Sequence, residues 1–125
     1  MIPFYVGWGS AVDAAGGTYN SNSHSGVVTH SGSVASVSNA TANSNAQHGF
    51  RAQNHGFFYG NYMTANSNHQ GFLIDRFSAG RTAYSTVSNN TTGIVTNAMS
   101  FTATHLESFS GNVTNKTVSS DSVEQ

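Results

Sequence analysis

The feature that most constrains this chain is a degenerate repeat of about 23 residues, a period typical of proteins that stack one small supersecondary unit. The pentapeptide Thr-Ala-Asn-Ser-Asn occurs at residues 41–45 and again at 64–68, and residues 18–22 carry a copy with Tyr in place of Ala. The same step places an asparagine at each of positions 20, 43, 66, 89 and 112. Proteins built in this way usually serve as scaffolds or surfaces.

Each copy of the repeat continues from a polar segment into a glycine and then into apolar residues. The four junctions are Gly26-Val27-Val28, Gly49-Phe50, Gly71-Phe72-Leu73 and Gly93-Ile94-Val95. The unit is therefore a polar turn that leads into a strand, and we expect Asn20, Asn43, Asn66 and Asn89 to occupy equivalent turns. No helical periodicity of apolar residues persists along the chain, so strands are expected rather than helices.

The pattern predicts an all-β chain of many short strands separated by turns rich in Gly, Asn and Ser. The expected strands are residues 2–8, 26–29, 33–37, 49–53, 56–63, 71–75, 82–87, 93–104 and 112–118. Strands at this spacing favour antiparallel pairing in a sandwich or jelly-roll-like domain, with strands interwoven between subunits as an alternative. We expect one domain over residues 1–118 and a flexible C-terminal tail over 119–125.

The clearest alternation in the chain lies between residues 93 and 104. Val95, Met99, Phe101 and Ala103 fall on one side of a continuous strand, and threonines and small residues fall on the other. This alternation predicts that Phe101 lies in the core, where its replacement by alanine would cost about 3–5 kcal/mol.

Composition narrows the class of protein. Leu, Ile, Val and Phe together make up only about a fifth of the chain, but the net charge is −1 and charged residues are 7%, which does not fit a disordered chain. Aromatic residues, at 11%, are expected to supply the core. A net charge so close to zero favours self-association. Four basic residues are too few to form a basic surface that binds the nucleic-acid backbone. No segment is long and apolar enough to predict a membrane span.

Ser, Thr, Asn and Gly make up nearly half of the chain, which suits extracellular surfaces, fibres and viral shells. The N-terminal segment lacks the basic and hydrophobic regions of a secretion signal, so the expected location is a virion surface or the extracellular space. The chain contains no cysteine and therefore no disulfide or thiolate metal site.

Residues with catalytic or metal-binding chemistry are present without a recognisable pattern. The histidine pairs His24/His30 and His48/His55 lack the spacing and the nearby carboxylate of a metal site, and we interpret them as hydrogen-bonding turn residues. The chain has no nucleophile motif, and its few acidic residues lie far apart in the sequence. We therefore expect no enzyme, no cofactor and no metal.

The run from Phe57 to Tyr62 is the best candidate for either a core strand or a sugar-binding face. It contains four aromatic residues, and alternation along a strand directs Phe57 and Tyr59 to one side and Phe58 and Tyr62 to the other. One side is expected in the core and the other against a neighbouring subunit, with a stacking platform for carbohydrate as an alternative. Phe57, Tyr59 and Tyr62 are the candidate contact residues.

Residues 39–45 and the run Ser110-Gly111-Asn112-Val113-Thr114-Asn115 resemble phrases common in tailed-bacteriophage fibres and other virion surface proteins. The resemblance implies a non-enzymatic structural subunit, either a decoration, head-fibre or tail-accessory protein, and transfers no functional residues. The expected partners are further copies of the chain, as a trimer or larger homo-oligomer, and other virion proteins. A carbohydrate-binding or adhesin module, in contact with cell-surface glycans, and an extracellular filament subunit are the alternatives.

Overall fold

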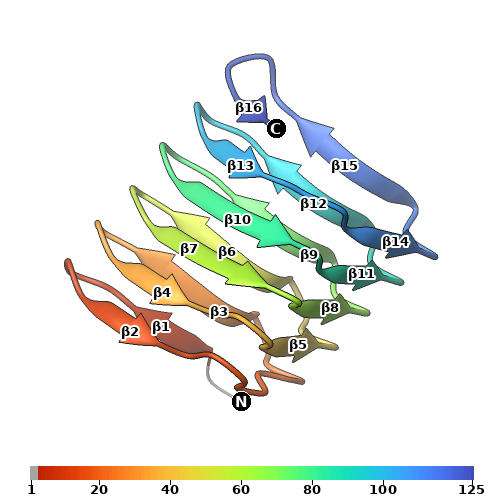
Figure 1. Ribbon diagram of the computed structural model, residues 1–125, viewed down its shortest axis with the longest axis horizontal. Coiled ribbons are helices and arrows are strands. Elements are labelled where there is room, and N and C mark those ends of the chain that lie inside the picture. Colours follow the sequence, from red (N-terminus) through yellow and green to blue (C-terminus); the bar gives the residue numbers. More distant parts are fainter. Residues whose placement is uncertain (1–2) are drawn as a thin grey trace.

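The computed structural model describes residues 3–125 and shows a β-solenoid of about six coils (Figure 1). Each coil passes through up to three strands, and strands from successive coils pair in three sheets that we name A, B and C. Sheet A contains β1 (Phe4–Val6), β3 (Ser25–His30), β6 (His48–Gln53), β9 (Gln70–Ile74), β12 (Thr92–Thr96) and β15 (Thr114–Val118). Sheet B contains β2 (Ala11–Asp13), β4 (Val34–Ser36), β7 (Phe57–Asn61), β10 (Ala79–Ala83), β13 (Phe101–Ala103) and β16 (Val123–Glu124). Sheet C contains β5 (Thr41–Asn43), β8 (Thr64–Asn66), β11 (Thr86–Ser88) and β14 (Ser108–Ser110).

The strands pair in parallel, so the expectation of an antiparallel sandwich or jelly roll is wrong. Each strand pairs with the equivalent strand one coil away, as in β3 with β6 and β7 with β10, and not with its neighbour in sequence. A parallel partner requires a long connection, and here the rest of the coil supplies it. The length of the repeat thus sets the pairing interval, which is the number of residues between paired positions on adjacent strands.

The pairing interval is not constant along the molecule. Val27 pairs with Phe50 across 23 residues, whereas Phe50 pairs with Phe72, and Phe72 with Ile94, across 22. The missing residue lies in the turn between Asn68 and Gln70, which is one residue shorter than the turns before β3 and β6.

The shorter coils change which asparagines are equivalent. Asn43 and Asn66 pair in an outward column of sheet C, so the two positions are equivalent as expected, but they end strands β5 and β8 and do not lie in turns. The Oδ1 of Asn20 accepts the backbone N–H of Asn43. In the next coil Ser88 occupies that column, and Asn89 lies one position further along the chain. The expectation of a common position for Asn89 is therefore wrong, because it assumed an unvarying period.

A second set of asparagines forms a buried ladder at the corner between sheets C and A. From the second coil onward, each side-chain Oδ1 accepts hydrogen bonds from the backbone N–H and the Nδ2 of the corresponding residue in the preceding coil, with distances of 2.8–3.2 Å. Each Nδ2 of these coils also donates to a carbonyl of the preceding coil. The ladder residues are Asn22, Asn45, Asn68, Asn90 and Asn112. Since buried amides must find partners, this ladder fixes the stacking of the coils.

A column of glycines at the start of the sheet A strands sets how closely the coils approach. A Cβ added to Gly26, Gly49, Gly71 or Gly93 would lie 2.7, 2.6, 2.6 or 2.5 Å from a carbonyl oxygen of the next coil. That oxygen belongs to the next glycine of the column, or, for Gly93, to Asn115. Asn115 thus holds the last position of the column, and its own Cβ would meet a carbonyl if another coil of this geometry were added.

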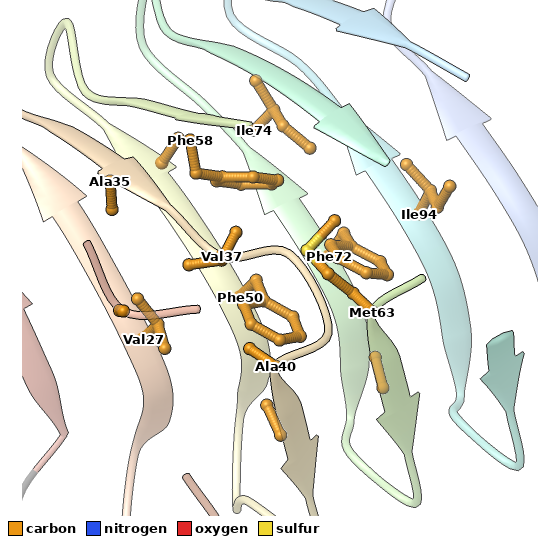
Figure 2. Close-up of a cluster of buried hydrophobic side chains, with 14 of the residues drawn as sticks. Val27, Ala35, Val37, Ala40, Phe50, Phe58, Met63, Phe72, Ile74 and Ile94 are labelled. Carbon is orange, nitrogen blue, oxygen red and sulfur yellow. The ribbon is translucent and has the colours of Figure 1, made fainter. Parts of the chain in front are cut away.

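Side chains from sheets A, B and C meet in a narrow core (Figure 2). Phe50 and Phe72, from adjacent sheet A strands, stack with centroids 5.1 Å apart, and Phe58 of sheet B packs against Phe72 at 6.0 Å. Val27, Phe50, Phe72 and Ile94 occupy one inward column of sheet A. These fully buried rings and aliphatic groups supply the apolar contacts that hold the three sheets together.

Phe101 lies outside this core. Its side chain is 39% exposed on the outer face of sheet B, whereas Thr102 is buried. The expected continuous strand is interrupted by Ala98 and Met99, which have φ of 51° and 60° and turn the chain from sheet A to sheet B. Alternation that is extended across this corner assigns the residues of β13 to the wrong faces of the sheet. Phe101 therefore does not belong to the core, contrary to the expectation from sequence.

The corners are built from residues with positive φ. Sixteen non-glycine residues and four glycines of residues 3–125 adopt this conformation, in an arrangement that repeats from coil to coil.

The last residues of the chain also join the solenoid, since β16 lies in the segment expected as a tail and Val123 pairs with Phe101. No helix among residues 3–125 is long and apolar enough to cross a membrane.

Candidate functional site on the outer face of sheet B

The outer face of sheet B carries a continuous column of apolar side chains. Strand pairing aligns one outward residue from each of the six strands, and all six are apolar. These residues, which we call the apolar column, are Ala11, Val34, Phe57, Ala79, Phe101 and Val123. Phe57, Phe101 and Val123 are 37, 39 and 50% exposed, so the column lies at the surface.

A second outward column runs beside the apolar column and is mixed in character. It consists of Asp13, Ser36, Tyr59, Arg81 and Ala103, each aligned with its neighbour by strand pairing. We call this set the mixed column. Its tyrosine ring lies 5.9 Å from the ring of Phe57 in the apolar column, so the two columns form one surface.

Aromatic side chains also line the two corners that border sheet B. At the corner toward sheet C, Tyr62 and Tyr84 have positive φ and stack with centroids 5.3 Å apart. At the corner toward sheet A, His55 and Phe77 stack at 5.6 Å. The exposed rings of these corners extend the apolar surface beyond the columns.

The three candidate residues from the sequence all lie on this surface. Phe57 and Tyr59 point outward from β7, and Phe58 points into the core, as the alternation predicts. Tyr62 was expected on the side of Phe58, but β7 ends at Asn61, and the positive φ of Tyr62 turns its ring outward to 61% exposure. The expectation for Tyr62 failed because alternation ends where the strand ends.

Several residues of the surface could not be found by local sequence patterns. Asp13, Ser36 and Arg81 come from three different coils and meet Tyr59 in one column only because of the pairing register. Tyr84 adopts the same positive-φ corner position as Tyr62, one coil away. A search of the sequence at the repeat interval would have aligned these positions with Tyr59 and Tyr62.

A shallow groove of about 330 Å³ lies at the N-terminal end of the same face. Its lining includes Asp13, Val34, Ser36 and Tyr59. The groove therefore combines a carboxylate, a hydroxyl group, an aromatic ring and apolar surface. This combination suits either a polar ligand with an apolar face or the side chains of another protein.

His24 and His48 form a separate arrangement at the corner between sheets C and A. His48 begins β6 and is 7% exposed, with its Nδ1 2.9 Å from the Oγ of Ser25 and its ring 5.8 Å from His24. Burial, and then the nearby charges of Arg51, His24 and His69, lower the pKa of His48 to about 3. His48 is thus a buried neutral side chain that forms a hydrogen bond, as expected, but it lies in a strand and not in the turn expected from sequence.

The rings of His24 and His48 are in contact between adjacent coils, and neither ring contacts the histidine that is near in sequence. Among residues 3–125, no group of three or more His, Cys, Asp and Glu side chains is arranged to hold a metal ion. The outer face of sheet B therefore remains the candidate functional site. Comparison with known protein families, with curated proteins and with solved structures finds no match for this chain.

Proposed function

We propose that this protein is a non-enzymatic structural subunit of a virion surface assembly that acts by self-association through the outer face of sheet B. The observation that carries the proposal is the apolar column, which continues without a polar interruption across all six strands of the sheet. Soluble monomers rarely expose a contiguous apolar surface of this kind, and a neighbouring subunit would cover it. The low charge of the chain adds little repulsion between copies.

The glycine column supports lateral association over end-to-end stacking. Each coil approaches the next so closely that the column position must lack a Cβ, and Asn115 does not satisfy this condition. A second copy cannot continue the solenoid beyond β15 with the same spacing unless the backbone shifts. This steric conflict argues against a filament that grows by adding coils end to end.

Sedimentation velocity over about 1–100 μM protein tests the proposal, because mass action makes a reversible oligomer depend on concentration. We expect the parent chain to form an oligomer that dissociates when Phe57 is replaced by serine. Val113→Ser serves as the matched control, because Val113 is 84% exposed but lies beyond the ladder residue Asn112, between sheets C and A. A parent chain that is monomeric at tens of micromolar would remove the proposal.

A carbohydrate-binding module is the second candidate, and the groove at the N-terminal end of sheet B favours it. Tyr59 could stack against the apolar face of a sugar ring, while the carboxylate of Asp13 and the hydroxyl of Ser36 accept hydrogen bonds from sugar hydroxyls. Screening the protein on a glycan array tests this function. Binding that persists in Tyr59→Ala would show that the groove is not the glycan site.

A further inference from the structure

Two opposite charges of the mixed column have no ion-pair partner among residues 3–125. Asp13 and Arg81 are both exposed, and the ion pairs found among residues 3–125 involve other residues, Arg76 with Asp75 and Lys116 with Glu124. The carboxylate of Asp13 accepts a hydrogen bond from the N–H of Ala15, and it forms no ion pair with a cation of the described residues.

These two charges cannot reach each other across the face. They lie on β2 and β10, which are separated by β4 and β7 in sheet B. Adjacent strands are about 4.8 Å apart, so three spacings separate the charges by about 14 Å. The mixed column therefore begins with a negative charge, continues through Ser36 and Tyr59, and reaches a positive charge in the fourth strand.

We propose that two copies of this chain associate face to face through sheet B, with Asp13 of each copy paired to the partner's Arg81. This inference rests on the self-association proposed above and specifies its geometry. The twofold axis of this dimer runs parallel to the strands, between β4 and β7. It makes the mixed column of one copy face the mixed column of its partner in reverse strand order. Asp13 then faces the partner's Arg81, and Ser36 faces the partner's Tyr59. The contact is isologous, so the ion pair forms twice.

The apolar column fits the same arrangement. In this register Ala11 faces the partner's Ala79, and Val34 faces the partner's Phe57, so small residues meet at the ends and larger ones meet in the centre. Packed sheets lie about 10 Å apart, a distance that an aspartate and an arginine side chain can bridge together. A twofold axis parallel to the solenoid axis would instead place the charged column against the apolar column and leave all four charges unpaired.

The register leaves part of the face uncovered. Strands β13 and β16 extend beyond the partner, so Phe101 and Val123 remain accessible in the pair. An isologous contact closes at two copies, and larger assemblies built from it contain an even number of chains. The trimer expected as the smallest assembly is thereby replaced by a dimer in this proposal.

Charge reversal tests the pairing by sedimentation velocity. Asp13→Arg and Arg81→Asp, taken singly, each place like charges opposite one another at two sites, and we expect each to weaken dimerisation at least about tenfold. The double variant Asp13→Arg/Arg81→Asp exchanges both charges, and we expect its dissociation constant to return to within about threefold of the parent. Thermal unfolding of each variant verifies that the subunit fold is unchanged.

The two phenylalanines of the apolar column provide a matched test of the register. Phe57 and Phe101 have nearly equal exposure, 37 and 39%, but only Phe57 is covered in the proposed pair. Phe57→Ser should dissociate the dimer, and Phe101→Ser should leave it intact. Equal effects of the two substitutions would overturn the register.

The outcomes distinguish the two proposals. A monomeric parent chain would end both the proposed function and the pairing. An oligomer that responds to Phe57→Ser but not to either charge reversal would retain self-association and overturn the pairing of Asp13 with the partner's Arg81. Failure of the double variant to recover, with its thermal unfolding unchanged, would overturn the pairing as well.

Discussion

The outer faces of sheets B and C differ sharply although the same coils build both. Sheet C presents only hydroxyl and amide groups in its two outward columns, which include Thr41, Asn43, Thr64 and Asn66. Sheet B presents the apolar column and the exposed aromatic corners. Since backbone pairing is the same on both sides, the solenoid does not determine the chemistry of its outer faces. The interior fixes the fold, and the outward residues give each face its own chemistry.

The largest expected effect compares an inward with an outward phenylalanine. Phe72→Ala removes a fully buried ring that stacks on Phe50 and should cost about 3–5 kcal/mol of unfolding free energy. Phe101→Ala, on the outer face of sheet B, should cost less than about 1 kcal/mol. Chemical denaturation of both variants measures the difference. Similar losses would mean that the outer face also stabilises the single subunit.

The next comparison uses two asparagines from one pentapeptide. Asn68 belongs to the buried ladder, and its removal leaves the backbone N–H of Asn45 without an acceptor, so Asn68→Ala should cost about 2–3 kcal/mol. Asn66 accepts hydrogen bonds from Ser67, Ser88 and Asn89 at the surface, where water can replace it. Asn66→Ala should therefore cost less than about 1 kcal/mol in the same denaturation experiment. A larger loss of stability in Asn66→Ala than in Asn68→Ala would mean that the outer column of sheet C, and not the buried ladder, holds the coils together.

Acid should weaken the fold through His48. Its pKa is about 3 in the folded chain and near the ordinary 6.5 when unfolded, so below pH 6.5 the unfolded state binds a proton that the folded state does not. Stability is complete above pH 6.5 and falls as the pH drops toward 3, by about 2 kcal/mol at pH 5. Urea denaturation between pH 8 and pH 5 measures this loss. The loss should be smaller in His48→Gln; an unchanged profile in that variant would point to another group.

The smallest expected effect concerns the corner between sheets A and B. Ala98 has a φ of 51°, a conformation that costs an L-residue about 1–2 kcal/mol and glycine very little. Ala98→Gly should stabilise the fold by about 0.5–1 kcal/mol, after the greater entropy of the unfolded glycine is taken into account. A thermal melt detects the change. Destabilisation would mean that the methyl group of Ala98 makes contacts that outweigh its backbone strain.

The sequence predicted local features of the fold better than its topology. Strand segments near Gly26, Gly49, Gly71 and Gly93 were anticipated, because a glycine followed by apolar residues is visible locally. Parallel pairing was not, because alternation within strands as short as these is the same for either orientation. Two observations together indicate the solenoid: glycines that recur once in every coil, and ladder asparagines that recur at the same interval.

The candidate site was anticipated only where it lies within one strand. Phe57 and Tyr59 follow from alternation inside β7, but Asp13 and Arg81 join them through pairing with other coils. Phe101 was misassigned for a related reason, since the turn at Ala98 and Met99 carries no glycine or proline to mark it. Corners made from ordinary residues with positive φ are difficult to recognise from sequence.

The asparagine ladder has a genetic consequence. In the interior of the ladder each rung gives hydrogen bonds to one neighbour and accepts the same kind from the other, so these rungs are interchangeable. Removing residues 70–91 in frame would bring Asn112 to the place of Asn90 and leave every ladder bond with an equivalent partner. Duplication of the same segment would lengthen the molecule by one coil, or about 4.8 Å. Natural variation in such a protein is therefore expected in whole coils, with the length of the outer face of sheet B inherited as a count of repeats.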